Sequence, residues 1–250
     1  MTRFDPTSST ALVTGASRGF GRAIASALHA AGANVVAVAR SREPLASLQH
    51  ELGARLTTEM ADVSDPVVAG TLVAQYRPHT LVLNAGAGPL MHPIQRHTWE
   101  TFSRNWDVDV RQVFHWVREA LLLPLEPGSS VITISSGAAV AGSPLSGGYA
   151  GAKATTRFIT SYAADESERA GLGIRFISVL PRLTPATELG AKAVAAYAGR
   201  DGRDVGEYLA DIGPTLTPDD VGKATIELLT SAEYGPGAYL LTAAGLRPAG

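Results

Sequence analysis

The chain has 250 residues, a formal net charge of −2 and a hydrophobic share of 45%. This length allows one large domain or two small ones, and the apolar share is ample for a buried core. With 23 acidic residues against 21 basic ones, the overall charge does not indicate a nucleic-acid partner, and the absence of cysteine excludes disulfides, thiolate metal sites and cysteine nucleophiles.

Residues 1–9 are polar, so they predict no secretory signal peptide. No apolar run approaches the ~20 residues that a membrane-spanning helix needs. We therefore expect a cytoplasmic protein without a membrane partner. The six histidines have no metal-ligand spacing with carboxylates, so we also expect no metal site.

Residues 10–14 form a short apolar run, partly β-branched, which predicts a buried strand. The segment 15–21, Gly-Ala-Ser-Arg-Gly-Phe-Gly, follows directly, and apolar residues then recur at helical spacing until Gly32. Glycines between a strand and a helix let the backbone approach a pyrophosphate at the helix N-terminus. The segment therefore predicts a dinucleotide-binding turn, with a plain strand-to-helix turn as the alternative.

The next predicted strand, 34–39, ends where an NAD site carries an acid for the ribose 2′-hydroxyl. This chain has Ala39, Arg40 and Arg42 in that region instead. No carboxylate would repel a 2′-phosphate there, and the two guanidiniums can bind it, while Arg18 in the glycine turn adds a third positive charge. Three solvated surface arginines are the alternative. Their coincidence with the missing acid favours NADP(H).

Strands and helices alternate along the rest of the chain. Further helices are predicted at about 42–53, 65–77, 98–123, 148–170 and 218–231. Further strands are predicted at about 55–60, 80–84, 130–135, 174–180 and 238–242. This order predicts an α/β fold, a single-domain Rossmann-type doubly wound parallel sheet of about seven strands with helices on both faces. The stretch 182–217 is irregular, most loop-like at 199–204, and is interpreted as a lid over the substrate.

Tyr149 and Lys153 stand four residues apart, and Ser136 lies thirteen residues before the tyrosine. One helical turn brings the ammonium beside the phenol, where its positive charge favours the phenolate. The serine hydroxyl can then hold the oxygen of a carbonyl or an alcohol. Lysine accounts for only three of the 21 basic residues, which suggests a specific role for this compact ammonium. Taken alone, the Tyr-Lys pair could also be two residues that merely share a helix face.

With these motifs in this order, the chain resembles the short-chain dehydrogenase/reductase family over essentially its whole length. The matching segments are the turn 14–21, Asp62-Val63 after the third strand, Asn84-Ala85-Gly86 after the fourth, the Ser136, Tyr149 and Lys153 set, and Pro181 after the sixth. By this resemblance the cofactor-binding residues are Gly15, Ser17, Arg18, Gly19, Phe20, Gly21, Arg40, Asp62, Val63, Asn84, Ala85, Gly86, Tyr149, Lys153, Pro181 and Thr184.

Two positions depart from the family pattern. The family's fourth catalytic residue, an asparagine, corresponds by spacing to Asp109, with Asn105 one turn earlier as the alternative. The glycine of the family's Pro-Gly pair is Arg182, which places a long cation near the expected nicotinamide ring. The predicted catalytic set is thus Ser136, Tyr149, Lys153 and Asp109.

The resemblance implies an NADP(H)-dependent oxidoreductase that interconverts a carbonyl and an alcohol on a small or medium-sized substrate by hydride transfer. A non-catalytic NADP-binding sensor or regulator of the same fold is the alternative; Asp109 and Arg182 favour it, and the intact catalytic set disfavours it. A dehydrogenase that works in the oxidative direction is a second alternative.

A stripe of apolar residues at helical spacing predicts protein core or a subunit interface. Its members are Trp99, Phe102, Trp106, Val110, Val113 and Val117. The family resemblance places this helix at a subunit contact, and so implies a homodimer or a homotetramer.

Overall fold

The computed structural model describes residues 5–7 and 9–249 of the chain. The signal-peptide prediction concerns residues 1–9, of which 1–4 and 8 lie outside the described residues. None of the helices in the described part of the chain has both the length and the apolar character that a membrane span requires.

One sheet organises the molecule, with strand order β3-β2-β1-β4-β5-β6-β7-β8. The strands are β1 Thr10–Thr14, β2 Asn34–Ala39, β3 Leu56–Met60, β4 Thr80–Leu83, β5 Ser130–Ile134, β6 Arg175–Pro181, β7 Gly237–Thr242 and β8 Gly245–Pro248. All neighbouring pairs are parallel except β7 and β8. This confirms the predicted doubly wound α/β fold, but the sheet has eight strands rather than about seven. The sequence did not signal β8, because a four-residue edge strand that ends in proline carries almost no periodicity.

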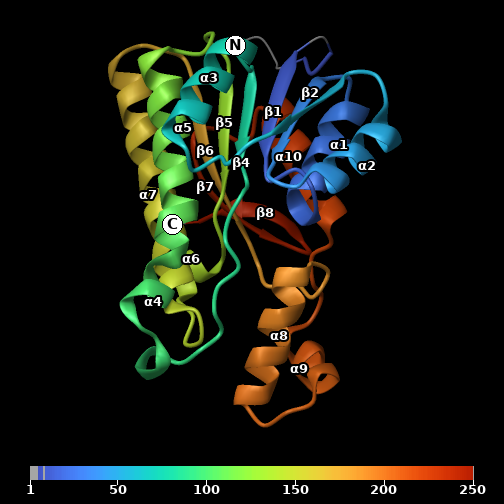
Figure 1. Cartoon of the computed structure of the whole chain (residues 1–250), viewed down its shortest axis with the longest axis vertical. Helices are drawn as coiled ribbons and strands as arrows, with labels where there is room; N and C mark the ends of the chain where they lie inside the picture. The colour runs from blue at the N-terminus through green and yellow to red at the C-terminus, as the bar shows by residue number, and fades with distance from the viewer. Residues whose placement is uncertain (1–4, 8, 250) are drawn as a thin grey trace.

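Helices cover both faces of this sheet (Figure 1). The α-helices are α1 Gly19–Ala30, α2 Arg42–Leu52, α3 Pro66–Tyr76, α4 Trp99–Asn105, α5 Arg111–Leu122, α6 Ala138–Ala141, α7 Gly147–Arg169, α8 Glu188–Arg200, α9 Val205–Ile212 and α10 Pro218–Thr230. The face that carries α1 and α2 also carries α10, which packs on α1, while α3, α5 and α7 pack together on the other face. Helices α8 and α9 extend beyond the carboxyl end of β6 (Figure 1).

The core is divided by the sheet into two apolar layers. Along β1, Ala11 and Val13 belong to the layer under α1 and α10, whereas Leu12 belongs to the layer under α3 and α5. Alternate strand residues point to opposite faces, so a sheet covered on both sides needs continuous apolar strands. Trp116 of α5 is fully buried in the second layer.

Most predicted elements lie within one residue of the observed bounds, but the helix predicted at 98–123 is not continuous. It consists of α4, a π-helical segment Trp106–Val110 and α5. The widened turn coincides with buried polar side chains, Asn105 and Asp109, which bond to the backbone of the segment after β4. Such single π-turns mark positions where side-chain bonding competes with a regular helix.

The apolar stripe on this helix divides between core and surface. Val113 and Val117 are buried, which confirms the core interpretation for them, whereas Trp99 is 77% exposed and Trp106 is 39% exposed. The exposed tryptophans lie on α4 and the π-helical segment, next to α7.

The stretch 182–217 is not irregular, as the sequence suggested, but contains α8 and α9. Thr187 caps α8 by accepting from Gly190 N at 3.1 Å, and Asp204 caps α9 by accepting from Gly206 N at 2.7 Å. Because α8 contains many glycine and alanine residues, its apolar residues do not recur clearly at helical spacing. Its N-cap residue is therefore a better sequence signal for this helix than its apolar periodicity. The segment predicted as most loop-like, 199–204, includes the end of α8, and only 201–204 form the loop between α8 and α9; the segments 182–187 and 213–217 are longer.

Candidate active site

The glycine turn folds tightly against the end of β4. Gly15 and Gly19 have φ values of +67° and +54°, a region that favours glycine. A Cβ at Gly15 would lie 2.8 Å from Ala85 Cα, and one at Gly21 would lie 2.2 Å from Gly15 O. Side chains at Gly15 and Gly21 would therefore force the turn away from β4 and from the start of α1.

Polar contacts fix this turn to the end of the neighbouring strand. Asn84 N and Ala85 N donate to Thr14 Oγ1 at 2.9 Å and 3.2 Å, and Asn84 Nδ2 donates to Thr14 O at 3.1 Å. Asn84 and Ala85 thus lie beside the turn, as the sequence predicts, and the amide of Asn84 serves to hold it closed.

The N-terminus of α1 is open to an anion. Its N-cap residue, Arg18, makes no side-chain capping hydrogen bond, and its first turn has no acidic residue. The first backbone N–H groups of a helix lack partners within the helix and, with the helix dipole, attract negative charge. Ser17 and Phe20 are half-buried on either side of Arg18. The turn and this helix end together fit a pyrophosphate.

Exposed arginines lie in the glycine turn and directly after β2. Arg18 and Arg40 are exposed, and Ala39 is buried at the end of β2, so no carboxylate stands there. Arg18 forms an ion pair with Glu188 at the start of α8, which also binds Lys192 at 2.6 Å. Exposed ion pairs of this kind are weak, so Arg18 can exchange Glu188 for a phosphate.

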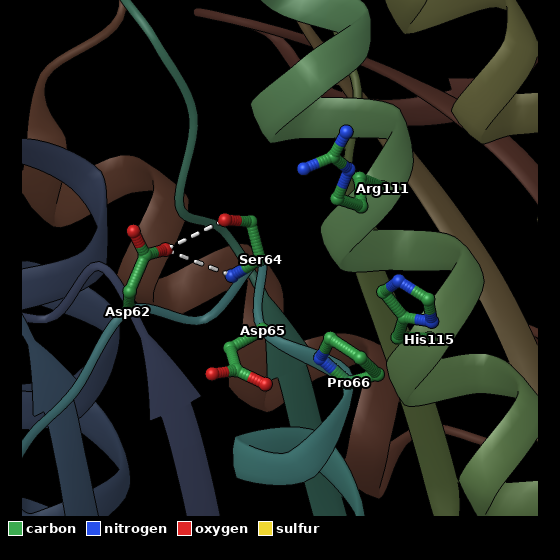
Figure 2. A pocket seen from close by; sticks show the side chains of 6 residues that line it. All are labelled: Asp62, Ser64, Asp65, Pro66, Arg111 and His115. Atoms are coloured by element: carbon green, nitrogen blue, oxygen red, sulfur yellow. Dashed lines mark hydrogen bonds between the residues drawn. The ribbon is translucent and has the colours of Figure 1, made fainter.

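A shallow hollow of about 570 Å³ opens beside Asp62 (Figure 2). The loop after β3 forms one side of it, and Arg111 and His115 of α5 form the other (Figure 2). Asp62 Oδ1 accepts from Ser64 N at 3.0 Å and from Ser64 Oγ at 2.8 Å. These two bonds outweigh the opposing effect of burial and, with smaller attractions from Arg40 and Arg111, hold the pKa of Asp62 below its ordinary value.

The backbone after Asp62 is equally fixed. Val63 is buried, and its carbonyl oxygen accepts from Trp116 Nε1 at 2.9 Å. The structure therefore presents an ionised carboxylate and a rigid backbone where the sequence predicts adenine contacts.

The predicted residues Ser136, Tyr149 and Lys153 lie on the segment after β5 and on the first turns of α7. Ser136 follows β5, and its Oγ accepts from Ala138 N at 3.2 Å. Lys153 Nζ lies 5.7 Å from the centroid of the Tyr149 ring and donates to Ile134 O at 3.0 Å. Ser135 Oγ donates to Lys153 O at 2.8 Å, which ties α7 to the strand.

Asp109 faces the ammonium of Lys153. Its carboxylate is fully buried, with Oδ2 at 3.2 Å from Lys153 Nζ and Oδ1 accepting from Ala87 N at 2.7 Å. A Cβ at Gly86 would lie 2.9 Å from Asp109 Oδ2, so only glycine leaves room for this carboxylate. Asn105 is also buried, but its Nδ2 donates to Ala87 O at 2.6 Å. The structure thus places Asp109, rather than Asn105, opposite the lysine.

Charge balance decides the state of Lys153. Burial acts to lower its pKa, but attraction to Asp109, and then to Tyr149, outweighs burial, and the pKa of Lys153 is raised. The lysine is therefore a stable cation in a buried position. A phenol next to a fixed ammonium, with a serine hydroxyl two residues after the Ile134 carbonyl that binds this ammonium, can exchange a proton with a bound oxygen atom and stabilise charge on it.

The family model for short chain dehydrogenases matches residues 9–198. The chain belongs to the short-chain dehydrogenase family. A glucose/ribitol-type short-chain dehydrogenase/reductase from Brucella melitensis superposes with a TM-score of 0.80 at 25% identity, covering 96% of each chain. A 3-ketoacyl-(acyl-carrier-protein) reductase from Brucella melitensis, complexed with NADH, superposes with a TM-score of 0.74 at 25% identity, covering 91% of this chain and 93% of that one.

Curated relatives match over shorter stretches. Carbonyl reductase (NADPH) 2 of Sus scrofa is 35% identical over 128 residues, 50% of this chain and 52% of that protein. L-xylulose reductase of Bos taurus is 36% identical over 135 residues, which are 53% of this chain and 54% of that protein. Versicolorin reductase 1 of Aspergillus parasiticus is 38% identical over 165 residues, which are 62% of this chain and 63% of that protein. The chain spans about half the length of the first two of these relatives.

The segment after β6 contains two of the predicted cofactor-binding residues, Pro181 and Thr184. Pro181 ends β6, and its carbonyl accepts from Gly137 N at 2.9 Å, beside Ser136. Thr184 is buried, and its hydroxyl donates to Leu216 O, so it holds the loop below α9. Its predicted cofactor contact stays a prediction.

Thr187 is a site residue that the sequence analysis missed. Its methyl group lies 3.8 Å from the position of a Cβ on Gly19, which brings the N-cap of α8 against the glycine turn. The signal was present in the sequence, since a threonine before an acidic residue is typical of a helix N-cap. Its position over the turn, however, depends on tertiary packing.

Proposed function

We propose that this protein is an oxidoreductase that uses NADP(H) to interconvert a carbonyl and an alcohol on a small or medium-sized substrate. The position of Lys153 beside both Tyr149 and the end of β5, the strand that leads into Ser136, carries this proposal. The three side chains lie one strand away from the glycine turn, because β4 alone separates β5 from β1.

The bound cofactor would supply the hydride. In reduction, Ser136 would hold the substrate oxygen, and Tyr149 would give that oxygen the proton that completes the alcohol. In oxidation Tyr149 would take the proton back. Lys153, kept cationic beside Asp109, would stabilise the phenolate that Tyr149 becomes after donation.

The residues at the turn fit the parts of a dinucleotide. The open end of α1 would hold the pyrophosphate, Asp62 and Val63 would bind adenine, and the exposed Arg18 and Arg40 would bind a 2′-phosphate. The name of carbonyl reductase (NADPH) 2 supports NADPH use, whereas the Brucella reductase structure contains NADH. The preference for NADP(H) therefore rests on the two arginines and on the lack of an acid at Ala39.

The relatives named carbonyl, xylulose and versicolorin reductases support a small-molecule substrate and the reductive direction. We further propose that α8 and α9, within the segment 182–217, act as a lid on this site. Thr187 lies against the glycine turn, and the Arg18–Glu188 ion pair joins α8 to it, which supports that role.

A second candidate function is an NADP-binding sensor without turnover. Asp109 and Arg182, where the family has asparagine and glycine, are the observations that favour it. A sensor would bind cofactor but would reduce no carbonyl.

The first experiment is a screen of ketones, aldehydes and thioesters with NADPH and NADH, in which the absorbance of the reduced cofactor is followed.

The decisive variant is Tyr149→Phe, which removes the proton donor and keeps the ring. We expect kcat to fall by about 10²–10⁴-fold while the Kd for NADPH changes little. Tyr234→Phe is the matched control and should keep full activity, because this phenol donates to Glu227 beside the amino end of β6, away from Tyr149. If Tyr149→Phe turned over substrate as fast as the wild type, the assigned role of Tyr149 would be wrong. If the wild type bound cofactor but reduced no carbonyl compound, the sensor would be favoured.

We also propose that the protein is a homodimer or a homotetramer. Helices α5 and α7, packed side by side, carry exposed aromatic rings: Phe114 is 50% exposed, Phe158 is 54% exposed and Tyr162 is 62% exposed. Rings of this size are common in subunit contacts and uncommon on a free surface.

A further inference from the structure

A second cavity lies between the carboxyl end of the sheet and α9. It has a volume of about 160 Å³, and its wall includes Arg182, Tyr208, Ile212, Pro214, Thr215 and Leu216. Since one water molecule occupies ~30 Å³ of liquid, the cavity has room for about five waters, or for a short carbon chain. Ala243, just after β7, also contributes to its wall, so sheet and lid enclose it together.

Most of this wall is apolar, with a single cation. Leu216 is buried, and Ile212 and Pro214 add hydrocarbon surface. Burial, followed by Tyr197 and Asp201, raises the pKa of Tyr208 despite the opposite effect of Arg203, so this phenol stays neutral at pH 7 and can donate a hydrogen bond. Arg182 is the only group in the wall that is charged at neutral pH.

Two acidic residues of α8 and α9 pair with cations other than Arg182. Asp211 pairs with Arg203 at 2.8 Å, and Glu188 pairs with Arg18 and with Lys192. Within residues 5–7 and 9–249, no ion pair and no side-chain hydrogen bond involves Arg182. The guanidinium is thus available to an external anion at the rim of an apolar cavity.

The backbone of Arg182 is fixed next to the catalytic serine. Arg182 N donates to Leu241 O at 3.0 Å, and Arg182 Cα lies 3.7 Å from the position of a Cβ on Gly137, the residue after Ser136. Neighbouring strands lie about 4.8 Å apart, so a substrate whose oxygen is held at Ser136 needs only a short chain to reach this cavity.

We propose that this cavity binds the distal part of the substrate and that Arg182 selects substrates ending in a carboxylate. This inference rests on the proposed function and names its substrate class, carbonyl compounds with an apolar spacer and a terminal carboxylate. A planar guanidinium binds a planar carboxylate through two parallel hydrogen bonds, which a neutral ester cannot match. The phenol of Tyr208 can add a further hydrogen bond.

The test compares straight-chain keto acids of increasing length with their methyl esters. At the best length, we expect the wild type to prefer the acid by about tenfold or more in kcat/KM, mainly through KM. Arg182→Gln should abolish this preference, and Arg182→Lys should restore part of it. Added salt should reduce the preference in the wild type, because the attraction is between charges near the surface.

Arg200→Gln is the matched control, because Arg200 is an exposed arginine on α8 outside the cavity wall. It should leave the acid-to-ester ratio unchanged. Calorimetric titration of the NADP-bound protein with the saturated carboxylic acid of the best length gives a readout that needs no turnover, and Arg182→Gln should weaken this binding about tenfold.

The outcomes separate this inference from the proposed function. Equal use of acid and ester by the wild type, or an equal loss of both in Arg182→Gln, would overturn the inference and leave the reductase proposal standing. Reduction of no carbonyl compound at all would overturn the reductase proposal itself.

Discussion

Asp109 gives this site a charge that an asparagine would not supply. Its carboxylate lies 3.2 Å from Lys153 Nζ, and both groups are shielded from solvent. Breaking a buried pair leaves the other charge uncompensated, which costs more than the pair itself contributes. The protonation of Lys153 therefore depends mainly on the carboxylate of Asp109.

We expect Asp109→Asn to lower the free energy of unfolding at pH 7 by about 3 kcal/mol. Because the pKa of Lys153 is raised in the folded protein, the pair stabilises the fold fully at a pH below 10.5, the ordinary pKa of lysine. This contribution is lost as pH rises through the pKa of Lys153 in the folded protein. In Asp109→Asn the attraction to the carboxylate is gone, so burial prevails and lowers the pKa of Lys153. The free energy of unfolding of this variant therefore increases as pH rises. The difference between the two proteins should therefore narrow from neutral to alkaline pH.

Urea unfolding at a series of pH values measures this difference. Asp107→Asn is the control, because Asp107 is exposed and pairs with Arg111 at 3.6 Å on the surface. It should change stability by less than about 0.5 kcal/mol at every pH. A constant gap between wild type and Asp109→Asn up to pH 10 would show that the pair does not couple to proton binding.

In the proposed function, Arg40 is the residue on which the preference for NADP(H) depends most directly. We expect the wild type to bind NADPH at least about tenfold more tightly than NADH, equivalent to ~1.4 kcal/mol. Arg40→Gln should remove most of that preference by weakening NADPH binding alone, because only NADPH carries the 2′-phosphate. Titration of both cofactors checks this, with exposed Arg104→Gln as control. A tighter Kd for NADH in the wild type would refute the assignment.

At the scale of elements, α8 and α9 join the two halves of the candidate site. Thr187 touches the glycine turn, while Tyr197 of α8 hydrogen-bonds Ser143 in the loop between Ser136 and Tyr149. Ser143 Oγ in turn lies 2.6 Å from Ser146 Oγ, at the start of α7. The proposed lid is thus held at both ends, so it would respond to cofactor at one end and to substrate at the other.

Tyr197→Phe should loosen this lid without removing its packing. The phenyl ring can keep its stack on Tyr208, whose centroid lies 6.4 Å away, but the bond to Ser143 is lost. A net hydrogen bond contributes about 1 kcal/mol, so protease cleavage in the 201–204 loop should become about fivefold faster. Exposed Tyr162→Phe serves as the control, and an unchanged cleavage rate in Tyr197→Phe would mean that Ser143 does not restrain the lid.

At the scale of the whole molecule, the exposed rings on α5 and α7 determine the expected assembly. We predict that the wild type sediments as a dimer or a tetramer and that Phe158→Asp sediments as a smaller species, because a carboxylate in an apolar interface must be desolvated. Val67→Asp changes an exposed valine on α3 and should sediment like the wild type. A wild-type monomer at micromolar concentration would refute the proposed assembly.

Much of this molecule follows from local sequence patterns. The apolar strands, the helices between them and the glycine turn are encoded in neighbouring residues, because periodicity, caps and the conformational freedom of glycine act over a few positions. The spacing of Tyr149 and Lys153 likewise determines that they share a helix face.

Only the tertiary structure could decide which distant residues meet. Spacing favoured Asp109 and left Asn105 as the alternative, but it is packing against the 85–87 backbone that directs Asp109 to Lys153. The pairing of Arg18 with Glu188, 170 positions away, and the cavity beside Arg182 likewise depend on where α8 and α9 fold back. Contacts of this kind are set by the burial of whole surfaces, which no short stretch of sequence contains.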